Sequence, residues 1–216
     1  MSTTLVIGNK NYSSWSLRPW LLLRHFAVDF DEVRLPLDTP EFRARVGQWS
    51  PTSRVPVLHD DGLTVWDSLA ICEYANERWL DGRGWPGDRA ARAVARSAAA
   101  EMHSGFGAMR AQLPMNVRRQ PNQFRGDADA ARDIARVQSL WADLRTRFGG
   151  GGPFLCGAFG IVDAMYAPVC VRLRGYGIRM DDTASAYLEA VFALPAMREW
   201  EAAALAETER VAIDEA

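Results

Sequence analysis

A cluster of hydroxyl side chains occupies residues 11–20, which read Asn-Tyr-Ser-Ser-Trp-Ser-Leu-Arg-Pro-Trp. The apolar, β-prone run 5–7 precedes the cluster, and apolar residues with helical character follow it. Ser13 and Ser14 are therefore expected in a turn between a strand and a helix. A hydroxyl can donate to an anion there, and the helix amino terminus adds partial positive charge. The sequence predicts an anion or thiolate site at this turn.

Two further motifs follow at fitting distances along the chain. Val55-Pro56 places a proline at the start of an apolar strand, and Asp67-Ser68 places an acid and a hydroxyl at the head of a helix. Either Asp67 or Ser68 can cap that helix through its side-chain oxygen. These residues need a sheet and helix ends to bring them together.

The first 79 residues alternate short β-prone runs with helical ones. A second strand is expected over 31–37, and Thr39-Pro40 suits the cap and first position of a second helix. Strands at 55–58 and 63–66 are expected to form a hairpin, because the Asp-Gly pair at 61–62 tolerates positive φ. A third helix should then run from residue 67 or 68 to residue 79.

From residue 89 onward the pattern is almost entirely helical. We expect one long alanine-rich helix over 89–113, an amphipathic helix over 127–148, and a helix from Ile161 that contains Asp163. The glycine- and proline-rich segment 80–88 separates the two patterns and reads as a linker.

The order strand, helix, strand, helix, Val-Pro, strand, turn, strand, Asp-Ser, helix resembles the glutathione-binding domain of a glutathione transferase. The zeta class is most similar, and its first-helix motif Ser-Ser-Cys-Ser-x-Arg corresponds to Ser-Ser-Trp-Ser-Leu-Arg at 13–18. The resemblance covers essentially the whole chain. It implies an α/β thioredoxin-like domain over 1–79, a linker over 80–88 and an all-α helical domain over 89–216.

The resemblance also implies glutathione as co-substrate, without a metal. An enzyme that uses this thiol as a nucleophile must stabilise its thiolate. Alignment on Arg18 places the family's catalytic serine at Ser13, with Ser14 adjacent as a second candidate. The alternative is that one of the two serines only caps the helix. Tyr12 is a further hydroxyl, although packing explains it as well.

The same resemblance assigns the remaining glutathione contacts. Val55-Pro56 resembles the family's Val-cis-Pro, whose valine backbone pairs with the cysteinyl amide. Asp67-Ser68 corresponds to the acid-or-amide and serine pair that binds the γ-glutamyl end. Arg54 is the first candidate for the glycine carboxylate, and the alternatives are Lys10 and Arg18.

The second substrate is expected between the domains, where small-molecule clefts commonly occur. Trp15 and the helical stripe of Met102, Phe106 and Met109 are candidates to line a pocket for a small hydrophobic electrophile, although such a stripe more often forms core or a dimer contact. The resemblance implies a Ser/Thr-x-x-Asp capping box at the start of the helix from Ile161, and here Gly160 stands where its hydroxyl belongs. Only the aspartate half of the box is present, so Asp163 is expected to bind backbone amides in a structural role.

Two other functions stay open. Trp15 stands where the zeta motif has a cysteine, so conjugation is the expected reaction and a maleylacetoacetate isomerase-like activity is the alternative. The second alternative is a non-enzymatic protein with the same fold that binds glutathione or apolar ligands, because a fold does not fix a function.

Composition narrows the class of protein. The chain has 216 residues, 48% of them hydrophobic, with a formal net charge of −2. This charge gives no basic footprint for nucleic acid, and no apolar run approaches a membrane span. The amino terminus lacks the features of a signal peptide. We therefore expect a cytoplasmic protein that forms a homodimer, as the resemblance implies, without nucleic-acid or membrane partners.

Overall fold

A four-stranded mixed sheet organises the first part of the chain in the computed structural model, which describes residues 3–121 and 126–215. Its strands are β1 (Thr4–Ile7), β2 (Asp31–Arg34), β3 (Val57–Asp60) and β4 (Leu63–Val65), in the order β2-β1-β3-β4. β1 is parallel to β2 and antiparallel to β3, which is antiparallel to β4. This confirms the predicted thioredoxin-like α/β domain.

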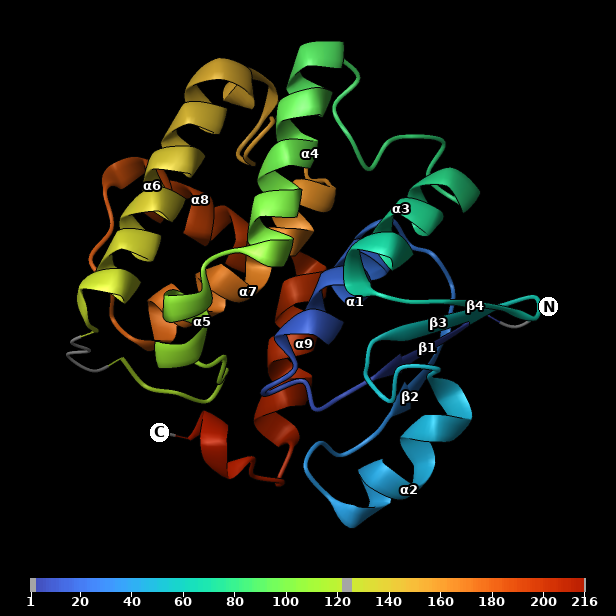
Figure 1. Cartoon of the computed structure of the whole chain (residues 1–216). Coiled ribbons are helices and arrows are strands. Elements are labelled where there is room, and N and C mark those ends of the chain that lie inside the picture. The colour runs from blue at the N-terminus through green and yellow to red at the C-terminus, as the bar shows by residue number, and fades with distance from the viewer. Residues whose placement is uncertain (1–2, 122–125, 216) are drawn as a thin grey trace.

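Three helices accompany the sheet: α1 (Ser14–His25), α2 (Pro40–Trp49) and α3 (Ser68–Arg78). Thr39 caps α2 by accepting a hydrogen bond from the Phe42 amide, and Pro40 is its first residue, as predicted. Figure 1 shows α1 between the sheet and the helical part of the chain, while α2 lies below the strands in this view. The amino terminus of α1 therefore faces the junction of the two parts.

The connections around β3 and β4 place the second and third motifs. Asp61 and Gly62 have φ of +50° and +84°, which confirms the predicted Asp-Gly turn. The Val55–Pro56 peptide bond is cis, as the resemblance implied, and the Trp66–Asp67 bond is also cis. Both bonds lie directly beside a strand or helix end that borders the candidate site.

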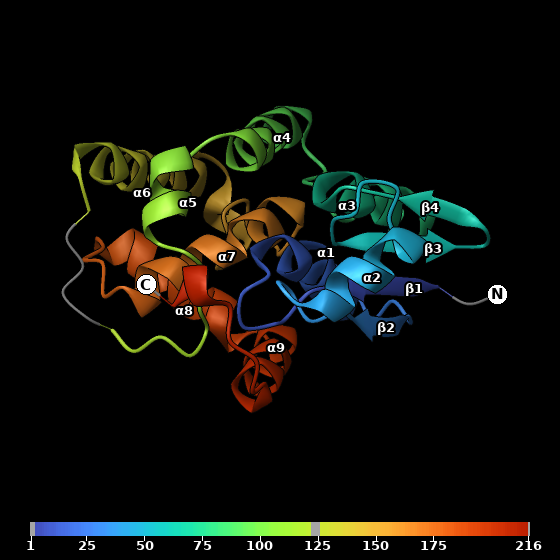
Figure 2. The ribbon, with the colours of Figure 1, turned by 60° about the horizontal axis from the view of Figure 1, so that its bottom comes forward.

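The second part of the chain is helical in its described residues. It contains α4 (Arg89–Ser104), α5 (Gly107–Gln112), α6 (Ala128–Phe148), α7 (Ile161–Gly175), α8 (Asp182–Ala193) and α9 (Pro195–Ala206), with short 3-10 turns η1 (Gly149–Gly151) and η2 (Ala212–Asp214). Figure 2 shows these helices grouped beside the sheet domain. The domain limits 1–79 and 89–216 stay predictions, and residues 1–2, 122–125 and 216 within them lie outside the described residues.

The prediction of one helix over 89–113 is wrong. The helix ends at Ser104, because Gly105 is extended and Phe106 has a φ of +58°. This left-handed residue turns the chain, so α5 starts in a new direction. Phe106 keeps its ring in the core, only 7% exposed, which explains why a bulky residue occupies an unfavourable backbone conformation.

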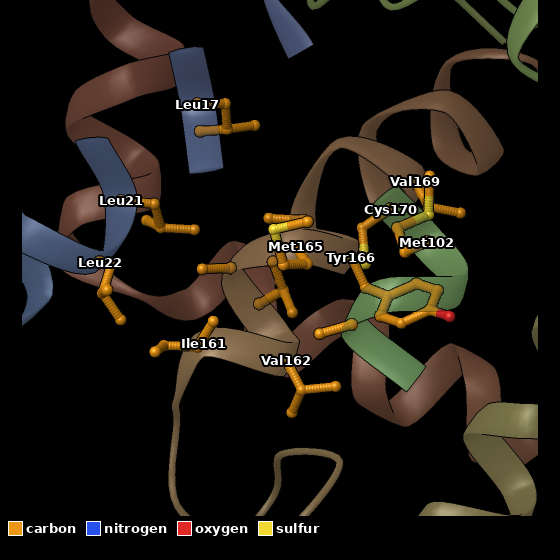
Figure 3. Close-up of a cluster of buried hydrophobic side chains, with 14 of the residues drawn as sticks. Leu17, Leu21, Leu22, Met102, Ile161, Val162, Met165, Tyr166, Val169 and Cys170 are labelled. Carbon is orange, nitrogen blue, oxygen red and sulfur yellow. The ribbon is translucent and has the colours of Figure 1, made fainter. Parts of the chain in front are cut away.

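The helix α1 joins the two parts through the core. Its residues Leu17, Leu21 and Leu22 are fully buried, and they face Ile161 and Met165 of α7 in Figure 3. On another side of α1, the Trp20 ring lies edge-on to Trp200 of α9, with 5.1 Å between ring centres. The position of the Ser13–Ser14 turn is therefore fixed by packing on both parts of the molecule.

Asp163 is buried in the first turn of α7. Its carboxylate accepts hydrogen bonds from the Gly160 amide at 2.9 Å and the Leu155 amide at 3.0 Å. These contacts keep one half of a capping box although residue 160 has no side chain to supply the other. Burial raises the pKa of Asp163 to about 7.

Candidate functional site

Ser13 occupies the N-cap position of α1, and its side chain is buried. Its hydroxyl donates to the Ser16 hydroxyl oxygen at 2.7 Å, and that oxygen also accepts from the Gly8 amide at 3.1 Å. None of the described α1 amides donates to the Ser13 side chain, so the hydroxyl does not act as a helix cap. It is instead held in a short hydroxyl chain at the end of β1.

Ser14 is the first residue of α1 and is also largely buried. Its hydroxyl has no hydrogen-bond partner within residues 3–121 and 126–215, whereas its backbone amide donates to the Tyr12 carbonyl oxygen at 2.9 Å. Both serines lie at the positive end of the helix dipole. The structure thus offers two hydroxyls at this position, one engaged with Ser16 and one available.

Two cavities meet at this turn. The first, here called the serine cavity, has a volume of about 380 Å³ and is lined by Ser13 and Ser14, among others. The second, here called the aspartate cavity, also has a volume of about 380 Å³ and is lined by residues that include Pro56 and the Asp67-Ser68 pair. Both are lined by Trp15, Arg54 and Val55. The three motifs separated in sequence therefore line two cavities that have three wall residues in common.

A larger cavity, of about 600 Å³, lies beside the 80–88 segment and the start of α7. Its walls include none of the motif residues identified from the sequence. Because volume alone does not indicate a function, we take the two smaller cavities, which the motif residues line, as the candidate site.

Asp67 connects the sheet domain to the helical part. Its carboxylate caps α3 by accepting from the Leu69 and Ala70 amides at 3.0 and 3.3 Å. The same carboxylate lies 2.9 Å from Nε2 of His103 on α4. Ser68 beside it is fully buried and accepts a hydrogen bond from Arg18 at 3.4 Å. The amino terminus of α3 thus presents an exposed carboxylate next to a buried hydroxyl.

Arg18 is a buried cation behind the site, only 1% exposed. Its guanidinium carbon lies 4.2 Å from the centre of the Trp15 ring. Burial, with a further contribution from the nearby charge of Arg110, lowers the pKa of Arg18 to about 9. The side chain therefore carries its charge at neutral pH but is shielded from a ligand by the Trp15 ring.

Arginines line the serine cavity on the side of the helical part. Arg110 and Arg172 bind backbone carbonyls. Among the described residues, these two arginines and the exposed Arg54 have no carboxylate within ion-pair distance. Asp214 is the one acidic residue on the walls of this cavity, and burial raises its pKa. Three cations and one carboxylate give the cavity a net positive charge that suits an anionic ligand.

The predicted pocket stripe on α4 and α5 has another position. Met102, Phe106 and Met109 are buried in the hydrophobic core and line neither cavity, whereas Trp15 lines both. Lys10, an alternative for the glycine carboxylate, forms an ion pair with Glu32 at 2.8 Å. Of the three basic candidates only Arg54 lines the cavities.

Sequence reasoning missed four residues of the site: His103, Arg110, Arg172 and Asp214. His103 directly follows Met102 on α4, so the end of the amphipathic stripe was the available signal for it. The other three come from segments far from the turn in sequence, and only the tertiary fold brings them there.

The described part of the chain has no group of three or more His, Cys, Asp or Glu side chains placed to hold a metal ion. Nor does any of its helices have the length and apolar character needed to cross a membrane.

Two protein-family models match the chain. Residues 12–78 match the model described as the glutathione S-transferase N-terminal domain, and residues 127–203 match the glutathione S-transferase C-terminal domain. The two ranges together span two thirds of the chain. They include the Ser13–Ser14 turn, the Val55-Pro56 motif and the Asp67-Ser68 motif.

Curated relatives match over shorter stretches. A dichloromethane dehalogenase from Methylorubrum extorquens is 41% identical over 62 residues, which are 28% of this chain and 22% of that protein. A probable maleylacetoacetate isomerase from Caenorhabditis elegans is 33% identical over 93 residues, 43% of this chain and 42% of that protein. The chain thus matches less than half the length of these relatives.

Solved structures share the fold over nearly the whole chain. A glutathione transferase homolog from Burkholderia GL BGR1, with bound glutathione, has a TM-score of 0.71 at 23% identity and covers 96% of this chain and all, 100%, of that one. A Tau class glutathione S-transferase from mango has a TM-score of 0.70 at 18% identity, covering 99% of this chain and 96% of that one. At these identities the likeness shows the fold alone.

Proposed function

We propose, from the premise that this chain belongs to the glutathione S-transferase superfamily, that it binds glutathione and uses a serine hydroxyl to stabilise the thiolate for attack on a small electrophile. One observation carries the proposal. The Ser13–Ser14 turn, the cis Val55-Pro56 and the Asp67-Ser68 pair lie around two cavities that share walls.

The aspartate cavity suits the peptide part of glutathione. The Asp67 carboxylate is the proposed partner of the γ-glutamyl ammonium, and the Ser68 hydroxyl and amide at the start of α3 are the proposed partners of its carboxylate, since both residues line this cavity. The backbone of Val55 is the proposed partner of the cysteinyl amide. Arg54, which lines both cavities without an acidic partner, is the proposed ligand of the glycine carboxylate.

The sulfur is then placed at the amino terminus of α1. The helix dipole and one hydroxyl donor together stabilise a thiolate by about 1 to 3 kcal/mol, which lowers the thiol pKa into the range needed near pH 7. Ser13 is the first candidate for the donor. Its proton now goes to Ser16, and turning it to sulfur leaves the Ser16 oxygen with its Gly8 amide partner. Ser14 is the second candidate, because its hydroxyl is available.

The serine cavity is the proposed site of the electrophile. The walls formed by Arg110 and Arg172 favour an electrophile that carries an acidic group over the purely hydrophobic one that the sequence suggested. In conjugation the thiolate forms a C–S bond while the leaving group departs with its electron pair. A maleylacetoacetate isomerase-like reaction is the second candidate, supported by the match to the Caenorhabditis elegans protein.

From the resemblance we also propose that the chain forms a homodimer and that it is located in the cytoplasm. Sedimentation at micromolar concentration tests the first. A single monomeric species would contradict the homodimer.

Conjugation of matched electrophiles tests the function. Purified protein is mixed with glutathione and either a chloro-dinitrobenzoate or its methyl ester, which differ only in the acidic group. We expect turnover of both, with a lower KM for the acid. Binding of glutathione without turnover of any electrophile would favour the non-enzymatic binding protein instead.

A further inference from the structure

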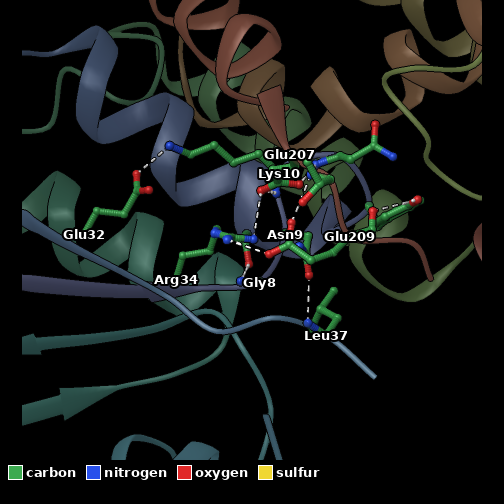
Figure 4. Close-up of polar contacts among 12 residues, drawn as sticks. Gly8, Asn9, Lys10, Glu32, Arg34, Leu37, Glu207 and Glu209 are labelled. Carbon is green, nitrogen blue, oxygen red and sulfur yellow. Dashed lines mark hydrogen bonds and ion pairs between the residues drawn. The ribbon is translucent and has the colours of Figure 1, made fainter. Parts of the chain in front are cut away.

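The chain that follows α9 crosses back to the turn that carries Ser13. Glu207 is the first residue after this helix, and its side chain is only 6% exposed. Its carboxylate accepts hydrogen bonds from the backbone amides of Lys10 and Asn11, at 2.7 and 3.1 Å. Figure 4 shows Glu207 beside Lys10, with Arg34 and Glu209 next to it. Residues almost 200 positions apart in sequence thus meet directly before the candidate catalytic serine.

These two amides belong to the turn that presents Ser13. The Ser13 amide donates to the Asn9 carbonyl oxygen at 2.8 Å, which closes the turn over residues 9–13. Consecutive backbone amides that point to one side form a concave site for an anion, and here the Glu207 carboxylate occupies that site. The segment after α9 thus contributes a carboxylate that binds two amides of this turn.

The guanidinium of Arg34 lies beside this carboxylate. Nη1 of Arg34 lies 3.5 Å from Glu207, while Nη2 of the same arginine pairs with Glu209 at 2.7 Å. The ammonium of Lys10 is engaged with Glu32. A buried carboxylate without a neighbouring cation would be unfavourable, and Arg34 on β2 supplies that cation.

A second set of contacts holds the same segment from the other side. Arg118 donates to the Glu207 carbonyl oxygen at 2.6 Å and to the Glu209 carbonyl oxygen at 2.9 Å. The Arg118 guanidinium also donates to the Tyr12 hydroxyl at 2.7 Å, and its backbone amide donates to the Asn11 side chain at 2.9 Å. The segment after α9 is thereby clamped between the serine turn and the chain that follows α5.

We infer that Glu207 is a positioning residue for the Ser13 hydroxyl: by binding the Lys10 and Asn11 amides, it fixes the turn in the geometry from which Ser13 donates to the thiolate. The inference rests on the proposed function and adds to it a residue outside both cavities. Glu207 touches neither glutathione nor electrophile in this account, and acts only through the turn.

The test compares two substitutions of the same chemistry in the same segment. In Glu207→Gln the amide oxygen can still accept, but the amide nitrogen then faces a backbone N–H, so one of the two amides loses its partner. Glu209→Gln is the matched control, because that side chain pairs with Arg34 and does not bind the turn. Both variants are examined with the full chain.

The first readout needs no ligand. Hydrogen exchange of the peptide that contains Lys10 and Asn11 should become roughly tenfold faster in Glu207→Gln and stay unchanged in Glu209→Gln. Equal exchange in wild type and Glu207→Gln would overturn the inference, because the turn would then be held without the carboxylate.

The second readout is the thiolate absorbance of bound glutathione against pH. Glu207→Gln should lower the thiolate fraction near pH 7 by about three- to tenfold, and Glu209→Gln should leave it unchanged. In a Ser13→Ala background, Glu207→Gln should cause no further loss, because both changes act on the same contact. An equal further loss in that background would contradict the positioning role. Absence of any thiolate in wild type would instead refute the proposed function, while the exchange readout would still report on the clamp.

Discussion

The Arg18 guanidinium carbon lies 4.2 Å from the centre of the Trp15 ring, so the tryptophan that replaces the cysteine of the zeta motif covers a buried cation. Arg110 lies 4.7 Å from the centre of the same ring, and the ring of His103 lies edge-on to it. Trp15 is thus a wall of both cavities and also the cover of an arginine that has no carboxylate partner among the described residues.

This relationship predicts a stability effect. Trp15→Cys removes the cation–π contact and much buried area, and should lower the free energy of unfolding by about 2 to 4 kcal/mol. Trp15→Phe keeps an aromatic face and should lose about half as much. Urea unfolding of both variants measures the difference. A cysteine variant as stable as wild type would show that the ring does not support Arg18.

Asp67 should be needed for glutathione affinity beyond its role as a helix cap. Asp67→Ala is expected to raise the Kd of glutathione roughly tenfold or more, because a charge-assisted contact to the γ-glutamyl ammonium is lost. Titration calorimetry measures this. Asp127 caps α6 with the same pattern of two amides and lines neither cavity, so Asp127→Ala is the control. Asp127→Ala should lose a helix cap in the same way, with glutathione affinity unchanged. Equal Kd values for the two variants would remove Asp67 from the binding site.

Arg110 should select for an acidic group on the electrophile. Arg110→Gln is expected to raise the KM for the chloro-dinitrobenzoate about tenfold, because a charged hydrogen-bond partner is lost. The KM for its methyl ester should stay within about twofold, since the ester carries no charge for the guanidinium to bind. Steady-state kinetics with both substrates decides the matter. A parallel rise for acid and ester would show that Arg110 shapes the cavity without reading charge.

Asp163 should make the stability of the protein depend on pH. Its pKa is raised by burial to about 7 in the folded chain, above its unfolded value, so the folded state binds the extra proton. This contribution is fully present below about pH 4 and is lost as pH rises through about 7. Between pH 5 and pH 8 wild type should therefore lose about 2 to 3 kcal/mol relative to Asp163→Asn, which cannot titrate. Chemical unfolding at the two pH values tests this. A wild type that gains stability relative to Asp163→Asn as pH rises would contradict the prediction.

The sheet and most helices could be predicted from sequence because their signals are local. Alternation of apolar residues, the Thr39-Pro40 start and the Asp61-Gly62 turn each depend on a few neighbouring residues. The break between α4 and α5 could not be predicted in this way. Phe106 is a poor residue for positive φ, and only the burial of its ring in the tertiary core favours that conformation.

The residues of the candidate site also differ in whether local sequence signals could locate them. The three motifs of the sheet domain could be located because strand and helix ends fix them, and their meeting at two cavities follows from the sheet order. The arginine wall and Glu207 come from the helical part, where amphipathic periodicity indicates which face is buried but not which charged residue reaches the turn. For that reason the sequence suggested an apolar pocket, whereas the serine cavity carries three arginines.

The ultraviolet absorbance of bound glutathione as pH is raised, compared between wild type and Ser13→Ala, tests the central claim most directly. We expect a thiolate band in wild type well below the pH at which free glutathione ionises, and a clear upward shift of that transition in the variant. Ser14→Ala measured alongside assigns the donor between the two hydroxyls. A band that is unchanged in both variants, or absent from wild type at every glutathione concentration, would contradict a serine-stabilised thiolate at this turn.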